Sequence, residues 1–215
     1  MQSKVVGLRW GANTPQGSEA ARALLVDAAE GCFRELGFAN TTVDTVARRA
    51  NVSRATVYRY FDGRDELVVE VVLRTADRYL RRLRPEIDEL TSLAEVVVEW
   101  VVRVERATRR DSMLSLLWQP DREISSAAMM VLASAGLFER VMGFFAPYFQ
   151  RFAGEVRQGV DLPGVTEWIL RTLVSFLTVE GVNRRSRDGQ RTYLRLYMVP
   201  AICSHVNLAA GYIGD

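Results

Sequence analysis

The stretch at residues 42–61, TVDTVARRANVSRATVYRYF, predicts two short helices joined by a tight turn. Thr42 can cap the first helix, because its hydroxyl can accept a hydrogen bond from a backbone N–H that has no partner inside the helix. A chain that reverses within about three or four residues needs a left-handed residue, and after glycine Asn tolerates that conformation best. Asn51 is therefore expected to end the first helix, and Ser53 to cap the second.

The apolar residues of this stretch fall where two steeply crossing helices would share one small core. These residues are Val46, Ala47, Ala50, Val52, Val57, Tyr60 and Phe61. Ala47 is the most informative of them, because close approach of two helices requires a small side chain at the crossing.

With its apolar residues turned inward, the second helix keeps a basic outer face without acidic residues. This face consists of Arg54, Ala55, Thr56, Tyr58 and Arg59. Arg, Thr and Tyr can hydrogen-bond to phosphate oxygens, Arg can also bind a guanine edge, and Ala or a Thr methyl can contact a thymine methyl. The pattern indicates a helix that lies in a DNA groove, and the alternative is a solvated helix face with no ligand.

Together with its flanks, the stretch resembles the DNA-binding domain of TetR-type transcriptional regulators. The shared features are Gly37-Phe38, a threonine pair at 41–42, Thr56-Val57-Tyr58-Arg59-Tyr60-Phe61 and Arg64-Asp65-Glu66-Leu67. The resemblance runs from about Leu24 to Leu73. Ala55 stands where the family often has Gly, and Arg64 where it usually has Lys. Neither departure weakens the likeness, because Ala favours a helix by up to about 1 kcal/mol over Gly and Arg keeps the charge.

The resemblance implies a role for each residue of the DNA-binding site. Thr42, Tyr58 and Arg64 would contact phosphates, whereas Arg54, Ala55, Thr56 and Arg59 would face the major groove. The partners implied are double-stranded operator DNA, a second copy of the chain and a small-molecule effector.

Net charge and cysteine content indicate how the protein could bind nucleic acid and in which compartment it works. The net charge of +2 is close to balance, so any affinity for nucleic acid must come from local placement of charge. Residues 41–61 supply such a local excess, with four arginines and one acid. The two cysteines are too few for a disulfide scaffold, and no signal peptide or membrane span is visible, so we expect a cytoplasmic protein.

Helical periodicity along the chain predicts an all-α fold with three parts. Residues 1–17 form a flexible arm, whose Lys4 and Arg9 either reach a DNA minor groove or belong to a loose terminus. Residues 18–62 form a three-helix helix-turn-helix head. Residues 63–215 form a larger helical domain for effector binding and dimerisation.

Glycine and proline mark the expected ends of the helices. Gly37 ends the first helix, which starts at Ser18, and Pro85 stops a helix that starts at Arg64. Pro147 and Pro200 should kink helices or mark their ends. The remaining helices are expected at 92–110, 112–119, 123–134, 136–154, 163–182 and 189–211.

The larger domain is dense in big apolar side chains, which the resemblance assigns to a pocket for an apolar or amphipathic effector. Helical spacing of such residues is more often typical of a core, although a small-molecule site is also lined mostly by apolar groups. The pocket candidates are Trp100, Met113, Leu117, Trp118, Met142, Phe145, Phe149, Trp168, Phe176 and the polar anchor Glu180.

The last two predicted helices carry apolar residues on more than one side, which favours burial against a second copy. The interface candidates are Ile169, Leu173, Tyr193, Tyr197, Ile202 and His205. The alternative is a monomer in which these residues form the interior.

No catalytic or metal site is expected. His205 is the sole histidine, and because Cys203 lies two residues away on a predicted helix, the two side chains diverge by about 200°. No zinc-ligand spacing, phosphate-binding loop or nucleophile elbow is present.

We therefore expect a ligand-responsive transcriptional regulator rather than an enzyme, most simply a repressor that binds a palindromic operator as a homodimer, without a cofactor. The alternative is a helical small-molecule carrier or protein-interaction module that does not bind DNA.

Overall fold

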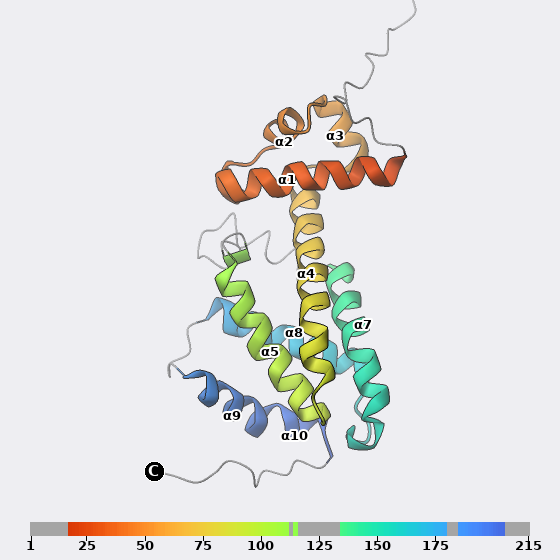
Figure 1. Cartoon of the computed structure of the whole chain (residues 1–215), viewed down its shortest axis with the longest axis vertical. Coiled ribbons are helices and arrows are strands. Elements are labelled where there is room, and N and C mark those ends of the chain that lie inside the picture. Colours follow the sequence, from red (N-terminus) through yellow and green to blue (C-terminus); the bar gives the residue numbers. More distant parts are fainter. Residues whose placement is uncertain (1–16, 112–113, 116–133, 180–184, 205–215) are drawn as a thin grey trace, which may run out of the picture. The chain divides into compact units, whose positions relative to one another are not determined.

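The computed structural model describes residues 17–111, 114–115, 134–179 and 185–204 (Figure 1). Every regular element within these ranges is a helix, and the one β feature there is an isolated bridge between Val156 and Cys203. The all-α prediction is therefore confirmed. None of the described helices combines the length and apolar character that a membrane crossing requires.

The chain divides into two compact units. The first runs to Thr75 and also takes in residues 114–115, and the second contains the described residues from Ala76 to Asp111 and from Ser134 onward. Helix α4 (Arg64–Asp88) contributes its first turns to the first unit and its last turns to the second. The predicted arm at residues 1–17, except Gly17, lies outside the described residues.

The first unit begins with helix α1 (Ser18–Asn40), which breaks where the sequence predicted. Gly37 has a φ of 76°, a left-handed conformation that suits glycine, and a short helical turn follows it. The break lets Phe38 fold back onto Phe33, with ring centroids 4.8 Å apart. Both rings are buried, so α1 presents an aromatic face to the rest of the unit.

Two short helices complete the head: α2 (Val43–Arg49) packs on α1, and α3 (Arg54–Tyr60) packs on α2. Val46, Ala47 and Val57 are fully or almost fully buried between them, as the spacing predicted. Phe61 closes this core just after α3 ends.

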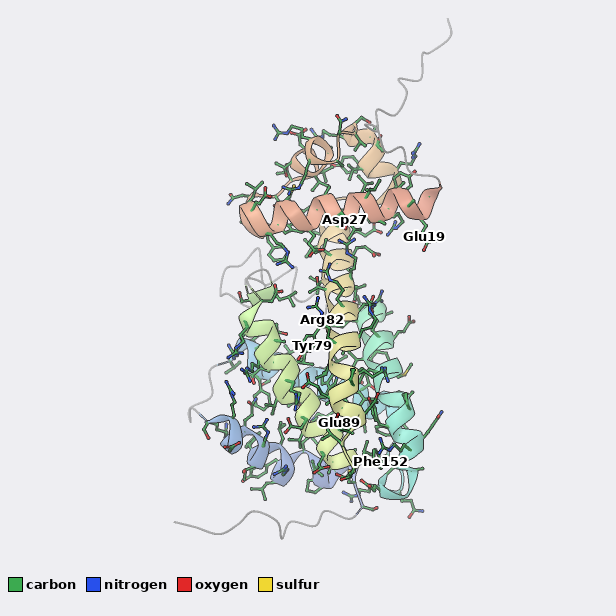
Figure 2. The ribbon with its side chains drawn as sticks, in the orientation of Figure 1. Glu19, Asp27, Tyr79, Arg82, Glu89 and Phe152 are labelled. Atoms are coloured by element: carbon green, nitrogen blue, oxygen red, sulfur yellow. The ribbon has the colours of Figure 1, made fainter. Side chains whose placement is uncertain are left out.

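Arginines of the first unit tie α1 to α3 and α4. Arg22 donates to the Tyr60 carbonyl and to Glu66 and Glu70, both at 3.2 Å, and its guanidinium carbon lies 4.3 Å from the centroid of the Phe61 ring. Arg74 of α4 pairs with Asp27, which Figure 2 labels on α1, at 2.6 Å. These contacts join α1 to the end of α3 and to the first turns of α4.

The predicted stop of α4 at Pro85 is wrong, because the helix continues to Asp88. Proline removes one backbone donor, but its fixed φ is already helical, so contacts beyond it can offset the loss. Ile87 is fully buried, and the Tyr148 hydroxyl donates to the Asp88 carboxylate at 2.6 Å. Tertiary contacts thus allow α4 to continue about one turn beyond Pro85, to Asp88.

The second unit contains α5 (Leu93–Arg110), α7 (Ala135–Arg151), the 3-10 turn η2 (Ala153–Glu155), α8 (Leu162–Thr178), α9 (Arg187–Tyr197) and α10 (Val199–Ile202). Each long helix begins with a side-chain cap: Ser92, Ser134, Asp161 and Ser186 accept from the backbone N–H three residues on. The starts of α5, α7, α8 and α9 lie within two residues of the predicted positions.

The two prolines that were expected to kink helices or to mark their ends differ in outcome. The helix expected at 189–211 divides at Met198, and Pro200 lies in the first turn of α10, where its missing donor costs little. Pro147 lies inside α7, which continues to Arg151. The helix expected at 112–119, except residues 114–115, and nearly all of the one at 123–134 lie outside the described residues, as do positions 180–184 and 205–211.

An aromatic cluster forms the centre of the second unit. Trp100 of α5 lies 5.2 Å from Phe145 of α7, between ring centroids, and Phe144 lies 5.6 Å from Tyr148. All four side chains are buried. Beside this cluster Tyr79 points from α4 toward α5 (Figure 2), and its hydroxyl donates to the Arg103 carbonyl at 2.8 Å.

A carboxylate network joins α5 to α9. Glu99, whose side chain is 13% exposed, accepts from Arg191 at 2.6 and 3.1 Å and from Arg103 at 3.1 Å. The hydrogen bond from Arg191 is the main cause that lowers the pKa of the Glu99 carboxyl from its ordinary value of 4.5. The ionised carboxylate therefore stabilises the fold above about pH 4.5, and this contribution is lost as the pH falls through the lowered pKa.

We predict that Glu99→Gln lowers the free energy of unfolding at pH 7 by on the order of 1–3 kcal/mol, because two partly buried guanidinium groups lose their carboxylate. Thermal unfolding followed by circular dichroism between pH 3 and pH 7 should show this difference shrinking below about pH 4.5. Glu167→Gln, which breaks an exposed pair with Arg171, is the control and should change stability by less than about 0.5 kcal/mol. A Glu99→Gln effect that is the same at all pH values would contradict the assignment.

Candidate nucleic-acid interface

The turn between α2 and α3 depends on Asn51, which has a φ of 54° and is the one described non-glycine residue with positive φ. Its N–H donates to the Arg48 carbonyl at 3.1 Å, and the next N–H, of Val52, donates to the Ala47 carbonyl at 2.9 Å. These two bonds close the end of α2 around the left-handed residue. The chain therefore reverses here as the sequence predicted.

Side-chain caps fix the start of both helices. The Thr42 hydroxyl accepts from the Thr45 N–H at 3.2 Å, while the Thr45 hydroxyl accepts from the Thr42 N–H at 2.9 Å, so the two residues form a reciprocal capping box. Ser53 accepts from the Thr56 N–H at 3.1 Å. Because Thr42 is exposed, its side chain both caps α2 and faces solvent at the same edge.

Helix α3 exposes four of the five residues that were expected on its outer face. Arg54, Ala55 and Arg59 are exposed, and the Tyr58 side chain is 51% accessible. Tyr58 thus presents a large ring and a hydroxyl to solvent without a core contact to explain its size.

Thr56 is the exception, and the prediction that it faces outward is wrong. It is 5% exposed, and its hydroxyl lies 2.9 Å from the Ser53 hydroxyl. The buried side of this seven-residue helix includes both Thr56 and Val57. Thr56 therefore supports the N-terminus of α3, and base contact from this residue requires a rearrangement of that cap.

The guanidinium of Arg64 turns into the head, where it donates to the Phe38 carbonyl. Its Nε is buried without a partner in the described part of the chain, and its Nη1 lies 3.5 Å from Asp65. The phosphate contact implied for Arg64 would therefore compete with an internal role. Only the fold reveals this role, because the accepting carbonyl lies 26 residues upstream.

The arginines of α2 are already paired. Arg49 forms a two-point ion pair with Glu35 at 2.6 and 2.8 Å, and these hydrogen bonds are the main cause that lowers the pKa of the Glu35 carboxyl. A β-carbon at Gly31 would lie 2.5 Å from the Arg49 Nε, so the absence of a side chain at Gly31 makes room for the pair. Arg48 pairs with Asp44 at 3.3 Å along one face of α2.

The arginines of α3 have no such partners. Within the described ranges neither Arg54 nor Arg59 makes an ion pair, and Arg59 instead stacks over Tyr60 at 4.8 Å and donates to its hydroxyl at 2.9 Å. The uncompensated positive charge of the helix-turn-helix therefore concentrates on the exposed side of α3. An anionic surface would meet two guanidinium groups that need not break an ion pair to bind it.

The pocket candidates fall into four groups. Trp100 and Phe145 are buried in the aromatic cluster, whereas Met142, Phe149 and Phe176 are half-buried. Trp168 is 37% exposed on α8. The other candidates, Met113, Leu117, Trp118 and Glu180, lie outside the described residues.

The dimer-interface candidates also differ in how exposed they are. Ile169, Leu173 and Ile202 are buried within the second unit of a single chain, so these three cannot supply an exposed contact face. Tyr193 is half-buried against Phe176, and Tyr197 is 67% exposed. His205 lies outside the described residues.

Neither cysteine forms part of a reactive site in the described residues. Cys32 and Cys203 are both buried as free thiols, and burial raises the pKa of Cys203 to about 11. The thiol rather than the thiolate is therefore present at neutral pH. No group of potential metal ligands occurs among the residues that the structure describes.

Comparison with known proteins agrees with this geometry. The family model for bacterial regulatory proteins of the tetR family matches residues 25–71, which include most of α1, all of α2 and α3, and the first turns of α4. An uncharacterised HTH-type transcriptional regulator of Mycobacterium tuberculosis is 27% identical over 189 residues, 86% of this chain and 87% of the relative.

Two solved structures share the fold. The transcriptional repressor QsdR of R. erythropolis, from the TetR family, aligns with a TM-score of 0.62 at 18% identity over 84% of this chain and 95% of its own. Thermus thermophilus FadR, a TetR-family repressor in complex with lauroyl-CoA, aligns with a TM-score of 0.57 at 21% identity over 81% of this chain and 92% of its own. With the capped helices and the Asn51 turn in place, residues 25–71 form a helix-turn-helix domain of the type that the tetR family model describes, and the chain is similar over most of its length to HTH-type transcriptional regulators.

Proposed function

We propose that this protein is a homodimeric repressor that binds a palindromic operator and is released by a small apolar or amphipathic effector. In this proposal residues 18–62 read the DNA, and residues 63–215 bind the effector and form the dimer. Two heads on one two-fold axis would meet half-sites about 34–36 Å apart, or a multiple of that spacing. Binding to chromosomal DNA would place the protein in the cytoplasm.

The observation that carries DNA binding is the unpaired positive charge on the exposed side of α3. Arg54 and Arg59 flank Ala55 and Tyr58 on that side, whereas Arg48 and Arg49 are held by carboxylates of α1 and α2. Arginine binds guanine edges and phosphates with two parallel hydrogen bonds, and the Tyr58 hydroxyl can reach a phosphate. We therefore assign α3 to the major groove, with Thr42 at the neighbouring phosphate backbone.

We predict that Arg59→Ala weakens binding to the protein's own upstream DNA by roughly 10- to 100-fold at moderate salt, because a bidentate arginine contributes about 1–3 kcal/mol. Tyr58→Phe should weaken binding less, and it should do so similarly on specific and unrelated DNA. Fluorescence anisotropy across a salt series measures both effects. Arg171→Ala, which removes the same charge from an exposed pair on α8, is the control. Parent-like affinity of Arg59→Ala would overturn the assignment of α3.

Effector binding and operator binding would oppose each other through one conformational equilibrium. An effector that weakens DNA binding must itself bind the DNA complex more weakly by the same factor. Lauroyl-CoA, the ligand of the Thermus thermophilus neighbour, is a suitable first probe, alongside free fatty acids, aromatic compounds and drug-like compounds in a thermal-shift screen.

Trp100 is the side chain best suited to orient an effector. It is 1% exposed, and its indole Nε1 has no hydrogen-bond acceptor in the described part of the chain. A buried donor without an acceptor costs on the order of 1–3 kcal/mol, so a ligand that brings an acceptor gains that energy back. We therefore propose that the effector carries a polar acceptor near the Trp100–Phe145 contact.

We predict that Trp100→Phe leaves the melting temperature of the free protein nearly unchanged, because loss of the orphan donor offsets part of the lost packing. The same variant should raise the effector concentration needed for DNA release by about tenfold, measured with any compound active on the parent. Trp168→Phe is the control, since that indole is partly exposed on α8. An unchanged response of Trp100→Phe would exclude the anchor, whereas no active compound on the parent would count against effector release itself.

The dimer contact is proposed for the exposed aromatic side of α8 and α9. Tyr193 packs edge-on against Phe176 at 6.2 Å and lies 4.9 Å from Tyr197, between ring centroids, so aromatic side chains run from α8 to α9. Tyr197, Leu196 and Trp168 are the large apolar side chains that α8 and α9 expose to solvent. Burial of these side chains against a second copy removes them from water.

We predict that Tyr197→Glu converts a dimer of about 48 kDa, twice the chain mass of 24.2 kDa, into a monomer at micromolar concentration. Sedimentation equilibrium measures the change, and operator affinity should fall with it. Tyr58→Glu places the same charge on the head and should leave the dimer intact while DNA binding is lost. A parent protein that sediments at 24 kDa would count against dimeric operator binding.

A further inference from the structure

Three arginines gather where the C-terminal half of α5 meets the beginning of α9. Arg106 and Arg110 lie four residues apart on α5 and therefore share one helix face, and Arg187 is the first residue of α9. Within the described residues none of the three makes an ion pair. They share no residue with the proposed DNA-binding face or with the aromatic cluster.

Hydrogen bonds between the two helices set the register of this cluster. Figure 1 shows α9 beside α5, and Arg191 donates to Glu99 while Gln190 donates to Glu105 at 2.5 Å. Arg187 lies one turn before Arg191 on α9. Arg106 and Arg110 lie two and three turns after Glu99 on the same face of α5. The three arginines thus lie beyond Glu99 along the contact between α5 and α9. The α5 face that carries Arg106 and Arg110 has no acidic residue after Glu99.

The neighbouring carboxylates are already engaged. Glu105 accepts from Arg109 at 2.8 Å and from Gln190, while Asp188 accepts from Arg191 at 3.1 Å. Asp111, which follows Arg110, has an interaction of its own. Partial loss of hydration, followed by repulsion from Arg110 and Arg187, lowers the pKa of the Arg106 guanidinium. Arg106 therefore meets positive charge where the other interhelical arginines meet carboxylates.

We propose that Arg106, Arg110 and Arg187 form a binding site for a phosphate-bearing small molecule, with the N-terminus of α9 at its edge. Guanidinium groups bind phosphate oxygens through paired, charge-assisted hydrogen bonds. The positive end of the α9 dipole adds to the attraction, since Ser186 caps only part of that terminus. A bound phosphate would replace the repulsion within the cluster by attraction to all three side chains. The site goes beyond the proposed function, because it requires neither DNA nor an apolar effector.

The first test is the stability of the free protein. Arg106→Gln should raise the melting temperature at low ionic strength, because it relieves repulsion, and the gain should disappear in about 0.5 M sodium chloride. Arg81→Gln, an exposed position on α4 with no ion pair in the described residues, is the matched control and should show no such gain. Failure of Arg106→Gln to gain stability at low salt would overturn the cluster as a site of repulsion.

The second test is ligand binding by the full chain, with inorganic pyrophosphate and ADP as probes and sodium chloride at equal ionic strength as reference. Both probes should raise the melting temperature of the parent, and calorimetry should show at least about a tenfold loss of affinity in the Arg106→Gln/Arg187→Gln double variant. The Arg81→Gln/Arg171→Gln variant, with the same charge loss, should bind like the parent. Tighter binding of ADP would point to a nucleotide-linked ligand, and equal binding to a site for the phosphates alone.

Equal melting temperatures in pyrophosphate, ADP and chloride would overturn the proposal, as would an unchanged affinity of the double variant. Neither outcome bears on operator binding, which the Arg59 variant tests separately.

Discussion

The left-handed backbone at Asn51 is the constraint on which the DNA-binding unit depends. It reverses the chain between two seven-residue helices, and helices so short have little stability of their own. The capping box at Thr42, the Ser53 cap and the buried contact of Ala47 with its surroundings hold α2 and α3 once the reversal is made. The direction in which Tyr58 and Arg59 face follows from that arrangement.

The described arginines fall into two classes, those that pair with a carboxylate inside the fold and those that do not. Arg22, Arg49 and Arg74 bind carboxylates of the first unit and stabilise the contacts of α1 with the helices around it. In the second unit Arg103 and Arg191 do the same through Glu99. Among the described arginines without a carboxylate, Arg54 and Arg59 lie on the outer side of α3, and Arg106, Arg110 and Arg187 lie at the junction of α5 with α9. The two proposed binding surfaces for anions are these places.

The second unit shows why large apolar residues are a poor guide to a ligand site on their own. Trp100 and Phe145 pack as an ordinary aromatic core, and Ile169, Leu173 and Ile202, expected at an interface, are interior residues. The informative feature of the core is polar: the Trp100 N–H has no acceptor in the described residues. The informative feature of the surface is the exposed ring of Tyr197. Both features are defined by a missing neighbour: an acceptor for the Trp100 N–H and packing around the Tyr197 ring, within the described residues.

The sequence alone determined the helices, their caps, the Gly37 break and the Asn51 turn, because these features depend on residues within about four positions of one another. It could not determine that Thr56 turns inward, that Arg64 binds the Phe38 carbonyl or that α4 passes Pro85. Those outcomes depend on groups that are distant in the sequence, such as Phe38 for Arg64 and Tyr148 for the end of α4. Tertiary structure also decided which arginines are neutralised, since a carboxylate such as Glu35 or Glu99 reaches its partner only after the helices have packed.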